Sequence, residues 1–127
     1  MKKNVIKVGI ISPDEYKQRT IAIAKGEYQP SRHEPKIWFE SLHSMAQILN
    51  NDNQKLLEII LEKKPGSLKE LAEVSGRKES NLSRTLKTMN RYGIVDLIKN
   101  KKAIKPVVKA TDFKLEFGLN THYQPNP

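Results

Sequence analysis

Residues 67–95 have the sequence SLKELAEVSGRKESNLSRTLKTMNRYGIV, and this stretch decides the fold. Ser67 and Glu70 have the spacing of a capping box, which predicts that a short helix begins here. Gly76 is expected to end that helix, because glycine readily adopts the left-handed conformation that follows a helix. A second helix is predicted over residues 79–92, because the glycine directly after it is a common C-terminal stop.

The spacing of three residues relates the two helices to each other. Ala72 is followed four positions later by Gly76 and ten positions later by Leu82. A small residue on the first helix allows close crossing, the glycine allows a tight turn, and the apolar residue returns the second helix to the core. This spacing is typical of a helix-turn-helix, in which the second helix enters the major groove of DNA.

The second helix has two chemically different faces. At about 100° per residue, Leu82, Leu86 and Met89 share one face, which we expect to be buried. The opposite face holds three cations and two hydroxyls without an acid: Ser80, Arg84, Lys87, Thr88 and Arg91. Asn81 lies on its flank. A merely solvated helix usually mixes both signs of charge, so this face favours DNA binding.

The side-chain chemistry divides the candidate DNA-binding residues into two groups. Arginine, asparagine and hydroxyl side chains can bond base edges, which predicts base contacts from Ser80, Asn81, Arg84 and Thr88. The remaining cations are expected to bind phosphates. They are Arg77, Lys78, Lys87, Arg91, Lys101 and Lys102.

The net charge is concentrated in the same part of the chain. The 127 residues include 23 Lys and Arg against 14 Asp and Glu, a formal charge of +9. Residues 77–109 hold ten basic and two acidic residues, so they account for +8 and the rest of the chain for +1. Such a block indicates an acidic partner, most commonly nucleic acid. The alternative is a solvated lysine-rich surface.

A basic hairpin is predicted directly after the second helix. Residues 94–98 and 103–109 have the composition of strands, and the turn between them, residues 99–102, carries three lysines. A hairpin in this position is typical of a winged helix, whose wing can contact phosphates. Pro106 cannot donate a ladder hydrogen bond, so its strand should lie at an edge. Alternatively, the lysines only prevent edge pairing with other chains.

Two further helices are expected before residue 67. The first covers residues 41–49, and the second runs to Lys64 with Asn51 or Asp52 as its cap. An apolar stripe is predicted on the second of these helices, formed by Leu56, Leu57, Ile60 and Leu61.

The two ends of the chain flank this region. A strand is predicted at Val5–Ile11, then a helix capped by Ser12 and stopped by Gly26, then a loop over residues 26–36. The apolar cluster Ile37-Trp38-Phe39 either seals this arm onto the core or contacts a partner. Alternating apolar residues from Phe113 to Leu119 predict a half-buried strand, which would pair with the N-terminal strand of the same or a second copy.

These predictions amount to an α+β fold, a winged helix-turn-helix with an N-terminal strand-helix arm and a C-terminal strand. Residues 1–36 form the arm and linker, residues 37–110 the DNA-binding domain, and residues 111–127 the last strand and a frayed tail.

Several classes of function are not expected from this composition. The absence of cysteine excludes disulfides and thiolate sites, and it fits a reducing, cytoplasmic compartment. The three histidines, His33, His43 and His122, share no metal-ligand spacing, and no phosphate-binding or catalytic motif is present. No stretch of about 18 apolar residues and no signal-peptide cleavage site occur. We therefore expect no enzyme activity, cofactor, metal or membrane partner.

Two resemblances extend these predictions. Residues 67–97, SLKELAEVSGRKESNLSRTLKTMNRYGIVDL, resemble the winged helix-turn-helix of multiple-antibiotic-resistance (MarR)-like bacterial regulators, with a match over about residues 55–109. The segments Ile37-Trp38-Phe39-Glu40-Ser41-Leu42 and Asp112-Phe113-Lys114-Leu115-Glu116-Phe117 are similar to those of small antitoxins of the TumA type. The second resemblance implies a homodimeric antitoxin that binds double-stranded DNA, represses its own operon and neutralises a cognate toxin protein.

The chain departs from the larger MarR-like regulators because it lacks their long flanking dimerisation helices. We therefore do not expect this chain to share their ligand pocket or their mode of dimerisation. An alternative function is a protein-interaction module, in which the winged helix and the two terminal strands bind a protein. RNA binding is a third possibility, but the chain has no aromatic stacking platform of the usual kind.

Overall fold

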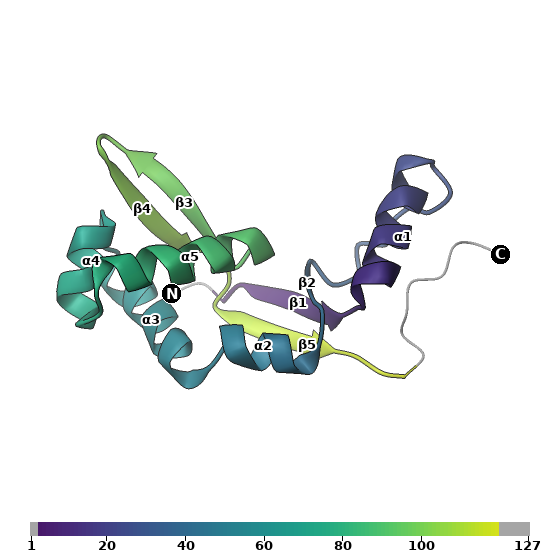
Figure 1. Ribbon diagram of the computed structural model, residues 1–127, viewed down its shortest axis with the longest axis horizontal. Coiled ribbons are helices and arrows are strands. Elements are labelled where there is room, and N and C mark those ends of the chain that lie inside the picture. The colour runs from purple at the N-terminus through teal and green to yellow at the C-terminus, as the bar shows by residue number, and fades with distance from the viewer. Residues whose placement is uncertain (1–2, 120–127) are drawn as a thin grey trace.

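Helices and strands are interleaved along the chain in a mixed α/β fold, as the computed structural model in Figure 1 shows. The structure describes residues 3–119, so the predicted frayed tail over 120–127 and His122 lie outside the described residues. The elements in chain order are β1 (Val5–Ile10), α1 (Pro13–Ala24), β2 (Ile37–Phe39), α2 (Leu42–Ile48), α3 (Asn51–Lys63), α4 (Leu68–Ser75), α5 (Glu79–Tyr92), β3 (Val95–Asn100), β4 (Ala103–Val108) and β5 (Asp112–Glu116).

Local capping chemistry sets most of the helix boundaries. The Ser12 and Ser67 hydroxyls accept from the backbone N–H three residues on, as predicted. The predicted cap of α3 at Asn51 or Asp52 is wrong, because Asn50 caps this helix by accepting from the Asn53 N–H at 2.8 Å. The Asn50 amide also donates to the Gln47 carbonyl at 2.9 Å. One side chain thus serves the end of α2 and the start of α3.

The turns around α4 and α5 depend on positive φ angles. Gly76 and Gly93 end the two helices at φ 74° and 86°, as predicted. At the start of α4, the Glu70 carboxylate accepts from the Gly66 N–H at 2.9 Å, one residue before the position expected in a capping box. These features fix the chain direction at the start of α4 and at the ends of both helices.

The two ends of the chain meet in a parallel three-stranded sheet with the order β2-β1-β5. The C-terminal strand therefore pairs with the N-terminal strand of the same chain. It ends at Glu116, which is paired with Gly9, whereas the sequence predicted a strand to Leu119. The pairing ends there because β1 stops at Ile10 and the chain turns into α1.

The core lies between this sheet and α3, α4 and α5. Ile37 and Phe39 are 2% and 0% exposed, which confirms that their segment seals the arm onto the core. The Phe39 ring stacks on Tyr92 of α5, with 4.7 Å between the ring centroids. The other core side chains include Val8, Leu56, Leu57, Ile60, Leu71, Leu82, Leu86, Met89, Ile94 and Val95.

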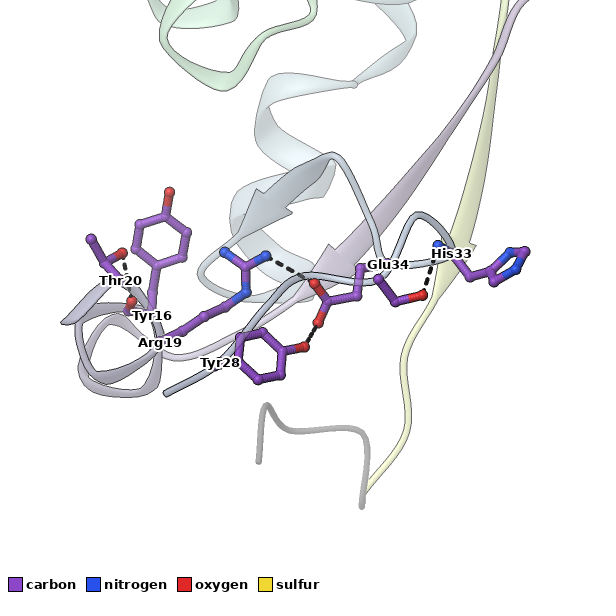
Figure 2. Close-up of polar contacts among 7 residues, drawn as sticks. Tyr16, Arg19, Thr20, Tyr28, His33 and Glu34 are labelled. Carbon is purple, nitrogen blue, oxygen red and sulfur yellow. Dashed lines mark hydrogen bonds and ion pairs between the residues drawn. The ribbon is translucent and has the colours of Figure 1, made fainter. Parts of the chain in front are cut away.

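Arg19 of α1 holds the loop over residues 26–36 in place (Figure 2). Its Nη2 donates to Glu34 at 3.0 Å, and the Tyr28 hydroxyl donates to the same carboxylate. The guanidinium carbon also lies 5.3 Å from the centre of the Trp38 ring. The loop is thereby attached to α1 and to β2, although it has no regular structure.

Gly9 of β1 lies directly against this cluster, which leads to a prediction. A Cβ atom at Gly9 would come within 2.6 Å of both Pro35 and the Trp38 ring. We expect Gly9→Ala to lower the free energy of unfolding by about 1–3 kcal/mol, the usual cost of overpacking. Denaturant unfolding followed by circular dichroism measures this loss. Gly66→Ala is the control, because its Cβ would meet nothing closer than 3.6 Å. Equal stability of the two variants would contradict the packing argument.

The strands β3 and β4 form an antiparallel hairpin that projects away from the three-stranded sheet (Figure 1). Asn100 pairs with Ala103, so the turn is Lys101-Lys102 rather than the predicted residues 99–102. Lys101 adopts a φ of 58°, which this tight turn requires. Pro106 pairs with Leu97 in a two-stranded sheet, in which every strand is an edge strand, as expected.

Candidate nucleic-acid interface

Helix α5 has one buried face and one exposed face, as its sequence predicts. Leu82, Leu86 and Met89 are all 0% exposed. The α4 side of this packing is formed by Leu71, which is also fully buried. Burial of this face fixes the rotation of α5 about its axis and turns the opposite face outward.

The outward face carries the predicted cations and hydroxyls. The exposed members of the set are Lys78, Ser80, Asn81, Arg84, Lys87 and Arg91, while Arg77 and Thr88 are half-buried. No acidic residue follows Glu79 within the helix. Among residues 3–119, the ion pairs join Lys7 to Glu116, Arg19 to Glu34 and Lys109 to Asp96, so none neutralises a cation of α5.

Arg77 is held by neutral side chains, which occupy most of its hydrogen-bond donors. Its Nε and Nη2 donate to Asn81 Oδ1 at 3.0 and 2.7 Å. Its Nη1 donates to Asn53 Oδ1 at 3.2 Å, and Nη2 also donates to Thr85 at 3.3 Å. Four of the five guanidinium N–H groups are thus used, and one N–H on Nη1 remains. Arg77 therefore links the start of α3 to the exposed helix, a role that the sequence prediction missed.

The same contacts determine what Asn81 presents to solvent. Its carbonyl oxygen accepts both hydrogen bonds from Arg77, while no residue within 3–119 accepts from its amide nitrogen. An asparagine side chain has two N–H donors in addition to that oxygen. The exposed part of Asn81 is consequently a hydrogen-bond donor.

Thr88 and Arg91 are also partly engaged within the helix. The Thr88 hydroxyl donates to the Arg84 carbonyl at 3.2 Å and accepts from Arg91 Nη2 at 3.4 Å. The Arg84 guanidinium has no hydrogen-bond partner among residues 3–119. Arg84 is therefore the exposed arginine of this face with all five donors available.

The hairpin contributes a second group of cations. Lys99, Lys101 and Lys102 are exposed at and beside its turn. Asn100 donates from its amide to the Gly66 carbonyl at 3.4 Å, which attaches the hairpin to the turn before α4. The hairpin and α5 are thus positioned against the same helix.

A groove of about 610 Å³ adjoins the C-terminal half of α5. Thr88 and Arg91 of the helix line it, together with Lys36 of the linker and Trp38 of β2. The sequence prediction did not include Lys36, because only the tertiary structure brings the arm beside α5.

No cluster of metal-ligating side chains occurs within residues 3–119. In the same range, no helix combines the length and apolar character needed to cross a membrane.

The comparisons with known proteins bear on this same region. Searches of curated proteins and of solved structures found no match. A family model described as HVO_A0114 matches residues 48–115, from the end of α2 through the hairpin into β5. These 68 positions are more than half of the 127 residues. The chain therefore belongs to the HVO_A0114 family.

Proposed function

We propose that this protein is a sequence-specific DNA-binding transcriptional regulator. In this proposal α3, α4, α5 and the β3–β4 hairpin form a winged helix-turn-helix, with α5 in the major groove and the hairpin as the wing. The observation that carries it is the exposed face of α5, which is cationic and free of acids while the opposite face is fully buried. A one-sided cationic helix beside a basic hairpin complements a phosphate backbone.

The side-chain contacts assign different roles to the candidate residues. Arg84 is the strongest candidate for base recognition, because an arginine with free donors can bond guanine O6 and N7. Lys78, Lys87, Arg91, Lys101 and Lys102 would bind phosphates. Ser80 remains a candidate base contact, whereas Thr88 has its hydroxyl proton committed to the backbone. Arg77 mainly positions Asn81, and its one remaining N–H on Nη1 would bind a sixth phosphate.

Arg84→Ala tests the assignment of α5 as the recognition helix. We expect the binding free energy for the protein's own promoter to weaken by about 1–3 kcal/mol, with a relaxed sequence preference. The measurement is fluorescence anisotropy with labelled promoter DNA and with a scrambled duplex. Arg32→Ala, which removes an exposed arginine of the linker, is the control. Unchanged promoter binding by Arg84→Ala would show that α5 does not read the bases.

The donor presented by Asn81 predicts a base preference. A lone donor fits the acceptors of guanine N7 and O6 or thymine O4, whereas adenine offers it N7 alone, because bidentate recognition of adenine also needs the amide oxygen. Asn81→Asp retains an acceptor for Arg77 but replaces the donor by a carboxylate oxygen. We expect it to lose about 1–3 kcal/mol of discrimination at one base pair, measured on single-base variants of the bound sequence. An unaltered preference at every base pair would contradict this role.

The resemblance to small antitoxins supports a more specific version of the proposal. In that version the protein acts as a homodimer in the cytoplasm, represses its own operon and neutralises a toxin. Co-purification with the product of the adjacent reading frame, together with promoter binding, is the expected result.

The exposed apolar side chains Leu115 and Phe117 favour a second candidate, a protein-interaction module. Recovery of a partner without DNA binding at any salt concentration would favour that candidate.

A further inference from the structure

Strand β5 presents an open edge to its surroundings. It lies at the end of the sheet order β2-β1-β5, and no other strand within residues 3–119 pairs with its outer edge. Leu115 in this strand is 39% exposed, and Phe117 directly after it is 51% exposed. An open edge with exposed apolar side chains is a template for pairing with another strand.

We propose that β5 pairs with β5 of a second copy, antiparallel and with a two-fold axis at Leu115, so that the two sheets join in a homodimer. A two-fold axis at one residue places the residue before it in one copy opposite the residue after it in the other copy, and so on along the strand. The strand must therefore be complementary to itself. With the axis at Leu115, Phe113 faces Phe117 of the other copy and Lys114 faces Glu116 of the other copy. Both pairings are of favourable kinds for antiparallel strands.

Other registers combine fewer of these pairings. An axis at Phe113 places Asp112 opposite Lys114, but it also places Leu115 opposite Thr111 and Glu116 opposite Ala110. An axis at Lys114 places lysine opposite lysine and Asp112 opposite Glu116, and an axis at Glu116 places glutamate opposite glutamate. An axis between two residues places the apolar face of one strand against the polar face of the other, because side chains alternate. The register with the axis at Leu115 is therefore the one in which all of residues 113–117 meet a residue of matching kind, apolar opposite apolar and lysine opposite glutamate.

A groove on the apolar face of β5 matches this arrangement. Met45, Leu49 and Leu57 line it together with Phe113 and Leu115, and its volume is about 430 Å³. In the proposed register, Phe117 of the other copy lies opposite Phe113 on this same face. An apolar cavity of about 150 Å³ is enough to bind benzene, so the groove can accept that phenyl ring.

The ion pair of Glu116 within the chain is compatible with the dimer. Glu116 Oε2 lies 3.3 Å from Lys7 Nζ, and the Glu116 side chain is still 54% exposed. A carboxylate has two oxygens and about four acceptor positions, so it can accept from Lys7 and from Lys114 of the other copy together.

Charge reversal of the full chain tests the proposed register. Sedimentation velocity without DNA is expected to show wild-type protein as a dimer of about 29 kDa, twice the 14.6 kDa chain. Lys114→Glu places glutamate opposite glutamate, and Glu116→Lys places lysine opposite lysine, so each is expected to weaken dimerisation at least tenfold. An equimolar mixture of the two variants should restore the dimer. A monomeric wild-type protein, or variants that dimerise as well as wild type, would overturn the proposal.

A single cysteine tests the position of the two-fold axis. The chain has no cysteine of its own, so Leu115→Cys introduces one thiol, which would face its counterpart in the dimer. Directly opposed residues of antiparallel strands have Cα atoms about 4.5–5.5 Å apart, which suits a disulfide. We expect rapid oxidation to a covalent dimer, whereas Val74→Cys, at a 45% exposed position of α4, should remain monomeric on denaturing gels. Equal cross-linking of the two variants would refute the axis at Leu115. Because these measurements contain no DNA, their outcome is independent of the proposed DNA binding.

Discussion

Replacing Phe39 with alanine is expected to lower the free energy of unfolding by about 3–5 kcal/mol. Phe39 is 0% exposed, and its ring stacks on Tyr92 at an interplanar angle of 26°. Because Phe39 belongs to β2 and Tyr92 ends α5, this contact attaches the edge of the sheet to the last turn of the candidate recognition helix. Its loss removes buried apolar area and leaves a cavity between the two.

Chemical denaturation followed by circular dichroism measures this effect. Tyr16→Ala is the matched control, because Tyr16 is an aromatic residue of α1 that is 45% exposed. We expect that control to lose less than about 1 kcal/mol, in the range of ordinary surface substitutions. A similar loss in both variants would show that the Phe39–Tyr92 contact has no special contribution.

The affinity for duplex DNA is expected to fall about 1,000-fold between 50 and 200 mM salt. Six candidate phosphate contacts would release about one counterion each, which gives a log–log slope of about −5 for one bound protomer. The contacts are Arg77, Lys78, Lys87, Arg91, Lys101 and Lys102. Arg77 has one N–H left for a phosphate, whereas the other five side chains are exposed.

Binding to a non-specific duplex at several salt concentrations measures this slope. The double variant Lys101→Gln/Lys102→Gln should reduce its magnitude by about two, because each phosphate contact contributes about one unit. Lys25→Gln, which removes an exposed lysine at the end of α1, should leave the slope unchanged. A flat salt response of the wild-type protein would contradict the electrostatic basis of the proposed function.

The parts of the candidate site that follow from short-range chemistry could be predicted from the sequence. Gly76 and Gly93 end helices because they adopt positive φ at little cost. Leu82, Leu86 and Met89 recur at helical spacing, so their burial and the exposure of Arg84 opposite them follow from one periodicity. These features depend on residues within about ten positions of one another.

Contacts between distant residues had no such local pattern. Arg77 contacts Asn53, 24 positions earlier, and no spacing rule connects an arginine in a turn with an asparagine in another helix. The groove that joins Lys36 to Arg91 likewise exists only because β2 packs beside α5.

The sequence by itself determined that residues 67–95 form two helices around a glycine turn, and that one helix carries a cationic face. These properties follow from the φ preferences of glycine and from the periodicity of apolar side chains, which neighbouring residues set. Only the tertiary structure decided that β5 pairs in parallel with β1 of the same chain, and that Arg77 is tied to Asn81 and Asn53. The alternation of apolar residues in β5 specifies a strand but not its neighbour, because the backbone groups that pair strands are the same for almost every residue.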